Sequence, residues 1–272
     1  MTTTISLLCP KGIVLATDTR ETIRDKYTGD ILSNRDGVEK IVQLSNSDNV
    51  GISCWGLAEV EEQGQPKKDI TPFLKEFDAT ITKGDNVDAV AEKLKNRLEQ
   101  ALPILDIGMG FHIAGYIQSD GHKVPHLRHV FHSWQEPGKF TNENSHNEYH
   151  LPNGDKVTYQ VAKEYPVLFN GDNLIANALF NYAPYIRPYF RIVPHLLSLD
   201  ECVELAKLVV STSISRLNYY FDIRQYNKKI PPIVGGSARI VTITEDGKFN
   251  WIQEKTETSS TPKDGTGNIN ME

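Results

Sequence analysis

The strongest constraint on the fold lies at the amino end, where two short apolar runs follow each other with only a turn between them. Residues 4–9 (TISLLC) and 13–19 (IVLATDT) are rich in β-branched side chains, which favour strands. The sequence between them is Pro10-Lys11-Gly12, and hairpin loops of three residues commonly end in glycine. The chain is therefore predicted to begin with a β-hairpin.

This hairpin sets an expected register. With a three-residue loop, Thr4 lies opposite Asp18 and Thr2 lies opposite Arg20. Side chains alternate between the two faces of a strand, so these four polar residues are expected to project to one side of the sheet.

The rest of the chain alternates between strand and helix patterns. Further strands are expected at 38–44, 50–55, 111–118, 124–131, 237–244 and 248–252. Helices are expected at 69–80, from residue 85 or 86 to 101, at 172–182 and at 199–217, the last with a capping box of Ser198 and Glu201. This order predicts an α+β protein, a four-layer αββα sandwich of two antiparallel sheets flanked by helices.

The domain organisation follows from the same pattern. We expect residues 2–254 to form a single domain, with an inserted hairpin or arm at 132–163, where Asn153-Gly154 is a strong turn signal. Residues 255–272 are rich in Thr, Ser and Gly, which predicts a disordered tail.

Composition excludes several classes of partner. A net charge of -6 without a cluster of Lys and Arg argues against binding to nucleic acid or to a membrane. The chain starts without a signal-peptide pattern, and its three cysteines, far apart in the sequence, give neither a disulfide framework nor zinc spacing. We therefore expect a cytoplasmic protein.

The amino end also has a chemical meaning. Removal of Met1 is favoured by a small second residue and would leave Thr2 with its hydroxyl and a free α-amine on the same residue. Such an amine has a reference pKa of about 7.7–8.0 and can serve as the base for the hydroxyl nucleophile. A nearby cation held by a carboxylate would support this chemistry, and Lys40 and Asp18 are the candidates.

At this point the sequence resembles a known family. Residues 2–5 (TTTI), 12–20 (GIVLATDTR), 39–41 (EKI) and 51–56 (GISCWG) look like the start of a proteasome β-type subunit, and 113–116 (IAGY) look like its central hairpin. Proteasome β-type subunits and the bacterial proteasome-like threonine proteases belong to the N-terminal-nucleophile hydrolases. The resemblance covers most of residues 2–131 and 164–252 and implies the fold of that superfamily.

The resemblance implies a role for each matching residue. The nucleophilic threonine falls on Thr2, the aspartate that pairs with lysine falls on Asp18, and the active-site lysine falls on Lys40. The family's glycine whose backbone N–H stabilises the oxyanion falls on Gly56. If the loop that contains it aligns with the family without a gap, that position falls on Trp55 instead.

The resemblance also has departures. The family places an Asp and a Ser before its late Gly-Gly to support the terminal amine, whereas residues 231–234 read PPIV here. The family's Gly-Ser-Gly reads Asn-Gly-Asp at 170–172. Asp172 and Ser237 are the residues that could substitute.

The resulting hypothesis is a threonine-type endopeptidase that cleaves peptides or unfolded proteins through an acyl-enzyme on Thr2, without a metal or an organic cofactor. The family resemblance implies a homo-oligomer and leaves open whether a regulatory ATPase takes part. Alternatives are a non-catalytic assembly or binding homologue, an amidase acting on small acyl amino acids, and a transpeptidase that passes the acyl group to an amine.

Four histidines near one turn raise the question of a metal site. On a strand, His122, His126 and His132 share a face, but no carboxylate lies among them. We therefore expect surface histidines around a turn and no zinc site. Cys54, beside Trp55, is expected to be a small buried strand residue.

Overall fold

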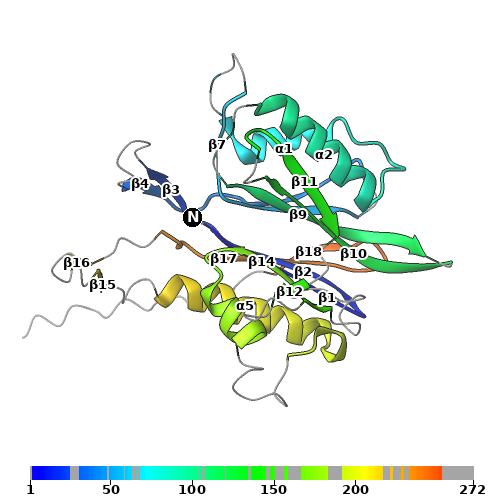
Figure 1. Ribbon diagram of the computed structural model, residues 1–272. Helices are drawn as coiled ribbons and strands as arrows, with labels where there is room; N and C mark the ends of the chain where they lie inside the picture. Colours follow the sequence, from blue (N-terminus) through cyan, green and yellow to red (C-terminus); the bar gives the residue numbers. More distant parts are fainter. Residues whose placement is uncertain are drawn as a thin grey trace, which may run out of the picture.

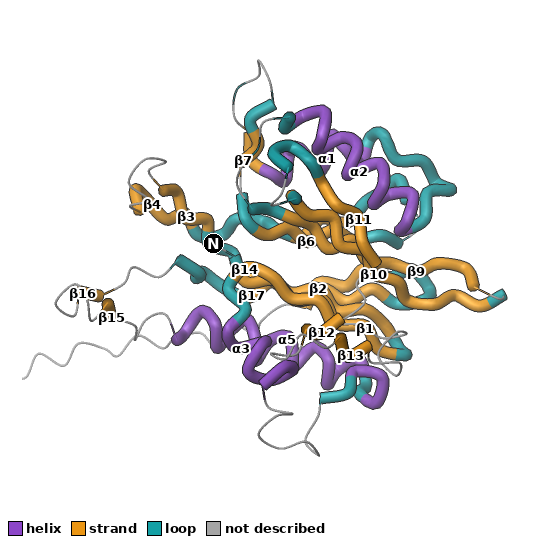
Figure 2. Tube along the Cα trace, in the orientation of Figure 1, coloured by secondary structure: helices purple, strands orange, loops and turns teal. Residues whose placement is uncertain are grey.

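Two five-stranded antiparallel sheets lie face to face, and helices cover the outer face of each (Figure 1 and Figure 2). The arrangement confirms the predicted four-layer sandwich of the α+β class. The computed structural model describes residues 2–24, 31–47, 49–57, 59–62, 66, 68–103, 105, 108–119, 121–133, 136–144, 148–150, 156–158, 167–182, 192–216, 221–222, 228–229 and 233–252.

The first sheet has the amino-terminal strand in its interior. Its strands run in the order β14 (Val167–Gly171), β1 (Thr3–Cys9), β2 (Gly12–Asp18), β17 (Ala238–Ile243) and β18 (Phe249–Ile252). Every residue of β1 and β2 is buried, because one face meets the other sheet and the other face meets helix α5 (Leu199–Arg216). The start of the chain is therefore enclosed in the core.

The β1–β2 hairpin forms as predicted, but its register differs from the expected one by one residue. Cys9 pairs with Gly12, which moves Asp18 from opposite Thr4 to a position level with Thr3. A shift of one residue moves a side chain to the other face of a strand. The expectation that the four polar residues at the open end of the hairpin share one face is therefore wrong.

Gly12 explains this shift. The glycine belongs to β2, and the turn consists of Pro10 and Lys11 alone. The site is also tight, since an added Cβ atom would lie 2.9 Å from Cδ1 of Leu199, at the start of α5, and 3.0 Å from the carbonyl oxygen of Ile243. A local sequence pattern reveals Gly12 but does not reveal that helix α5 packs next to it.

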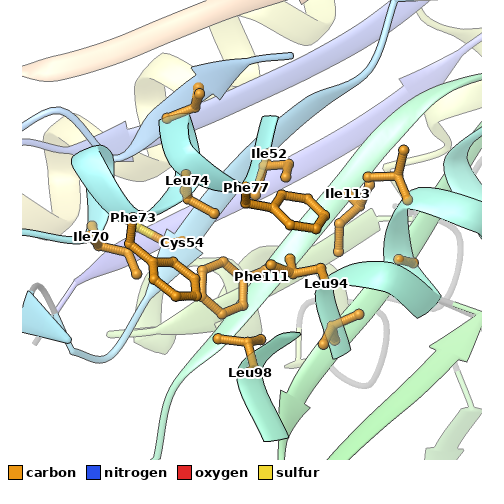
Figure 3. Close-up of a cluster of buried hydrophobic side chains, with 14 of the residues drawn as sticks. Ile52, Cys54, Ile70, Phe73, Leu74, Phe77, Leu94, Leu98, Phe111 and Ile113 are labelled. Atoms are coloured by element: carbon orange, nitrogen blue, oxygen red, sulfur yellow. The ribbon is translucent and has the colours of Figure 1, made fainter. Parts of the chain in front are cut away.

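The second sheet has the order β11 (Phe140–Asn144), β10 (His122–His132), β9 (Gly110–Ser119), β6 (Gly51–Trp55) and β5 (Ile41–Gln43). Helices α1 (Ile70–Asp78) and α2 (Val87–Ala101) cover its outer face. Figure 3 shows the apolar side chains that fill this interface, among them Phe73, Phe77 and Phe111. Cys54 lies in the same cluster, buried as predicted.

The helices form where their end signals predict. The side chain of Asn86 caps α2 by accepting a hydrogen bond from the N–H of Ala89 at 3.0 Å. The capping box of α5 is also present: Ser198 N–H donates to the Glu201 carboxylate at 2.7 Å, and Glu201 N–H donates to Ser198 Oγ at 3.2 Å. The predicted helix at 172–182 begins as the short α3 (Leu174–Ala176) and continues as the π-helix η2 (Asn177–Tyr182), and a 3-10 turn, η3 (Pro194–Leu196), precedes α5.

Four small hairpins complete the described part of the chain. They are β3 (Glu21–Arg24) with β4 (Ile31–Arg35), β7 (Glu59–Val60) with β8 (Lys68–Asp69), β12 (Glu148–His150) with β13 (Lys156–Thr158), and β15 (Phe221–Asp222) with β16 (Lys228–Lys229). The region 132–163 thus contributes the edge strand β11 and the β12–β13 pair. The predicted turn at Asn153-Gly154 and the tail at 255–272 lie outside the described residues.

Candidate active site

Lys40 joins the residues that the sequence singled out at the start of the chain. Its ammonium group donates to Thr2 Oγ1 at 3.1 Å, to Asp18 Oδ1 at 2.9 Å and to the carbonyl of Arg20 at 2.6 Å. A lysine ammonium has three hydrogens, so each of them has an acceptor. Only 2% of the Lys40 side chain and none of the Asp18 side chain is exposed, so the ion pair is buried.

The carboxylate of Asp18 is surrounded by donors. One oxygen, Oδ1, accepts from Lys40 and from the N–H of Thr3 at 3.0 Å. The other, Oδ2, accepts from the N–H groups of Arg20 at 3.1 Å and Gly235 at 3.2 Å. Each oxygen therefore has two donors, a setting that suits a carboxylate and fixes its position.

Neighbouring segments hold this pair in place. The carbonyl of Lys40 accepts from the N–H of Cys54 at 3.0 Å, which ties the lysine to the second sheet. The guanidinium of Arg20 makes two hydrogen bonds to Asp36, at 2.6 and 2.7 Å. A Cβ atom on Gly235 would lie 2.4 Å from that guanidinium, so a side chain at position 235 would displace the guanidinium.

The segment after β14 fixes Thr2 from the opposite side. The N–H of Asp172 donates to the carbonyl of Thr2 at 2.7 Å, and Thr3 Oγ1 donates to the carbonyl of Asp172 at 3.0 Å. Gly171 has a φ of +80°, which favours glycine, and an added Cβ atom there would lie 1.7 Å from the carbonyl oxygen of Thr2. This contact explains the glycine in the Asn-Gly-Asp sequence.

Of the two residues expected to support the amine, the structure brings Asp172 to Thr2 and leaves Ser237 apart from it. The N–H of Ser237 donates to Thr19 Oγ1 at 2.9 Å, and the residue is exposed. The carboxylate of Asp172 is paired through both oxygens with Arg216, in the last turn of α5. Sequence reasoning missed Arg216, because nothing local marks a residue at a helix end as the partner of a carboxylate 44 positions away.

Gly56 has an unusual backbone conformation. Its φ is +91°, and an added Cβ atom would lie 2.3 Å from the carbonyl oxygen of Gly108. These two facts explain the glycine structurally. Within the described residues no hydrogen bond links Gly56 to Thr2, and its oxyanion role stays a prediction. Its neighbour Trp55 donates from Nε1 to His129 Nε2 at 3.2 Å and packs against Gly110.

A second buried polar group lies between the sheets. His112, which is fully buried on β9, contacts Ser6 Oγ on β1 at 2.8 Å through Nδ1 and Asn170 Oδ1 on β14 at 2.8 Å through Nε2. An amide oxygen only accepts, so Nε2 carries the hydrogen and Nδ1 accepts from the Ser6 hydroxyl. Burial lowers the pKa of His112 to about 4. His112 therefore joins the two strands that meet at Thr2.

The histidines of β10 differ in part from the expected surface cluster. His126 lies 3.0 Å from the carboxylate of Asp88, whereas His132 is buried, so the surface prediction is wrong for His132. Burial lowers the pKa of His129 well below its usual value, and its ring stacks on Phe131. His126, His129 and His132 therefore lie in different surroundings.

A set of acidic side chains lies beside β3. Carboxylate oxygens of Glu21, Glu59 and Asp69 come within 4.8 Å of one another. The guanidinium of Arg35 forms ion pairs with two of these carboxylates, at 2.7 Å from Glu21 and 2.8 Å from Asp69. Burial raises the pKa of Glu21, and the arginine opposes that shift.

Among the described residues, no helix is both long and apolar enough to span a bilayer.

Comparison with known proteins agrees with the fold. The sequence matches no protein-family model and no curated protein. Solved structures with similar architecture include the Anbu (Gly-1) mutant from Hyphomicrobium sp. strain MC1. The match has a TM-score of 0.52 and 14% sequence identity, and it covers 94% of this chain and 89% of that one. The chain thus has a distantly proteasome-like fold of the N-terminal-nucleophile hydrolase type.

Proposed function

We propose that the chain is a threonine-type N-terminal-nucleophile hydrolase that cleaves peptide bonds through an acyl-enzyme on Thr2. The observation that carries the proposal is the contact of one buried ammonium, that of Lys40, with both Thr2 Oγ1 and Asp18. A buried lysine whose hydrogens point at a hydroxyl oxygen stabilises negative charge that develops on that oxygen.

The hydrogen bonds around Thr2 and Asp18 support one group as the base in this proposal. Lys40 donates to Thr2 Oγ1, so the hydroxyl hydrogen of Thr2 must point elsewhere. Asp18 already receives two donors on each oxygen and is poorly placed to act as the base. The remaining group is the α-amine that appears when Thr2 becomes the first residue, and it accepts the hydroxyl proton directly or through one water.

The reaction then follows from these roles. Thr2 Oγ attacks the peptide carbonyl, the N–H of Gly56 receives the oxyanion, and the protonated α-amine returns its proton to the leaving amine. Water then hydrolyses the ester, which releases the acyl product and restores the Thr2 hydroxyl. The same site would perform transpeptidation if an amine intercepted the ester. No step needs a metal or an organic cofactor, and the proposed partners are a peptide substrate and further copies of the chain.

A peptide epoxyketone tests the proposal, because its morpholine adduct requires both the hydroxyl and the amine of an N-terminal threonine. We expect the processed protein to gain the mass of the inhibitor on the peptide that begins at Thr2. Thr2 is only 4% exposed, so the reaction also tests whether a substrate reaches the hydroxyl. A protein with a free Thr2 that forms no adduct would favour the non-catalytic alternative.

Matched variants make the result specific. Thr2→Ala removes the nucleophile and must abolish the adduct, while Thr22→Ala changes a threonine on β3 whose hydroxyl donates to the carbonyl of Ile233. Edman sequencing of the untreated protein first establishes that Thr2 is the terminal residue. Retention of Met1 on native, folded protein would contradict the mechanism.

A further inference from the structure

The indole of Trp55 lies on the face of the second sheet that is turned towards the first sheet. Ser53, two residues earlier on β6, accepts from Thr4 Oγ1 of β1 at 3.3 Å, and side chains two residues apart on a strand share a face. Trp55 pairs with Gly110 of β9, and a Cβ atom on Gly110 would lie 2.7 Å from three atoms of the indole. The ring therefore occupies the space that a side chain at residue 110 would otherwise fill.

His129 of β10 contacts this indole from the far side of β9. Trp55 Nε1 donates to His129 Nε2 at 3.2 Å, and the two ring centroids lie 5.9 Å apart. The imidazole stacks on Phe131, with centroids 4.5 Å apart, and meets the ring of His112 edge to face at 5.4 Å. These two neighbours hold the imidazole so that its Nε2 atom stays directed at the indole.

The hydrogen bond also defines the protonation state of His129. An indole N–H only donates, so Nε2 of His129 accepts and the ring hydrogen is on Nδ1. Burial, with a smaller contribution from the neighbouring His112, lowers the pKa of His129 well below its usual value. The imidazole is therefore neutral at pH 7, which is the state that this contact requires.

The strand that carries Trp55 leads directly to Gly56. Successive N–H groups of a strand point to opposite edges, and the N–H of Cys54 donates to the carbonyl of Lys40 at 3.0 Å. Two residues later, the N–H of Gly56 leaves β6 on the same edge as this contact, whereas the N–H of Trp55 points to the β9 edge. This alternation favours Gly56 over Trp55 as the donor to the oxyanion.

We propose that His129 is a positioning residue for the oxyanion donor: it holds the indole of Trp55 and thereby fixes the direction of the Gly56 N–H. This inference rests on the proposed function, in which Gly56 receives the oxyanion. Trp55 and Gly56 share one planar peptide group, so a movement that rotates Trp55 also turns this N–H. Gly56 itself has a φ of +91° and lies where β6 ends, beyond the strand's pairing with β9.

Two variants separate the hydrogen bond from the ring packing. His129→Phe keeps a ring that can stack on Phe131 but has no acceptor for the indole, whereas His129→Gln supplies an amide oxygen as the acceptor. Epoxyketone labelling gives the maximal inactivation rate and the inhibitor constant KI. We expect His129→Phe to lower the maximal rate about tenfold or more with little change in KI, because the oxyanion forms only after the inhibitor binds. His129→Gln should restore most of that rate.

A double variant and a matched histidine make the result specific. Trp55→Phe removes the indole N–H, so His129→Phe should have little further effect in that background. His126→Gln changes a histidine on the same strand that contacts Asp88 of α2 instead, and it should label like the unmodified protein. Equal losses from His129→Phe with and without the indole, or no rescue by glutamine, would overturn the inference.

Nuclear magnetic resonance of isotope-labelled protein tests the geometry without chemistry at Thr2. We expect the signals of the Gly56 amide and the Trp55 indole to shift in His129→Phe and to lie near their original positions in His129→Gln. A shifted indole signal beside an unchanged Gly56 amide would show that His129 does not fix this N–H. If the unmodified protein with a free Thr2 forms no adduct, the proposed function fails, and these spectra still decide whether His129 positions Gly56.

Discussion

The carbonyl of Thr2 lies so close to Gly171 that a Cβ atom on residue 171 would come within 1.7 Å of it. Gly171→Ala must therefore displace the first residue or the segment that carries Asp172. We expect epoxyketone labelling to fall by about a hundredfold, because misplacement by about 1 Å costs that much. Second-order labelling rates measure the effect.

A control separates this clash from backbone strain. Gly121 has a φ of +81°, close to that of Gly171, but no atom lies within 4 Å of its added Cβ position. Gly121→Ala should cost about 1–3 kcal/mol of stability from strain alone and leave labelling unchanged. Equal labelling losses in the two variants would contradict the explanation.

The Lys40–Asp18 pair predicts a difference between stability and activity. Lys40→Met leaves a buried carboxylate without its cation, which we expect to cost about 3–5 kcal/mol in the free energy of unfolding. Adding Asp18→Asn should recover only part of that loss, because no unpaired charge remains but the amide NH2 group then faces a backbone N–H donor. Denaturant unfolding measures both variants.

Labelling of Thr2 should not recover in the same way. Both variants lack the ammonium at Thr2 Oγ1, so both should lose at least about 10²-fold in labelling rate. A double variant that regains stability and also regains labelling would show that Lys40 acts only on the fold.

Arg216 is expected to act on Thr2 through Asp172. Arg216→Lys keeps a positive charge but replaces the guanidinium, whose Nη2 contacts both oxygens of Asp172, and Arg216→Gln removes the charge as well. We expect labelling rates in the order Arg, Lys, Gln, spanning about tenfold or more. Glu204→Gln, an exposed single-charge change on the same helix, should match the unmodified protein.

The buried His112 predicts a pH dependence of stability. Its folded pKa of about 4 lies below the reference value of 6.5, so the unfolded chain binds the extra proton more readily. The contribution, up to about 3 kcal/mol, is fully present above pH 6.5 and is lost as the pH falls towards 4. His129 adds to the same trend, because its pKa is also lowered.

His112→Gln checks this assignment. The variant should flatten the slope of unfolding free energy between pH 6.5 and 4, while the slope that arises from His129 remains. An unchanged slope would show that His112 is not the titrating group.

The site shows what can be predicted from sequence. Thr2, Asp18 and Lys40 can be named as candidates from residue type and short stretches of strand, and the structure brings these side chains into contact. The register of the first hairpin differs from the predicted one by one residue, because the local pattern places Gly12 in the turn. The structure places Gly12 in β2 and close to Leu199 and Ile243, which are distant in sequence and invisible to a local pattern.

Most of the features that the sequence does not predict depend on pairing between segments that are far apart in the chain. Strand β14 pairs with β1 across 160 to 168 residues, and its sequence, VLFNG, is not among the strands that the local pattern predicts. The residues of the β3–β4 hairpin are outside the strands that the sequence predicts. The pairing of Asp172 with Arg216 depends on how α5 lies under the sheet, which no spacing in the sequence specifies.

Since β1 is an interior strand whose pairing begins at Thr3, residues added directly ahead of Thr2 would start next to the buried core of the sheet. An affinity tag placed ahead of Thr2 would lie beside the buried Lys40 and would abolish the free amine that the proposed mechanism needs. Recombinant versions meant for functional work should therefore carry their tag at the opposite terminus.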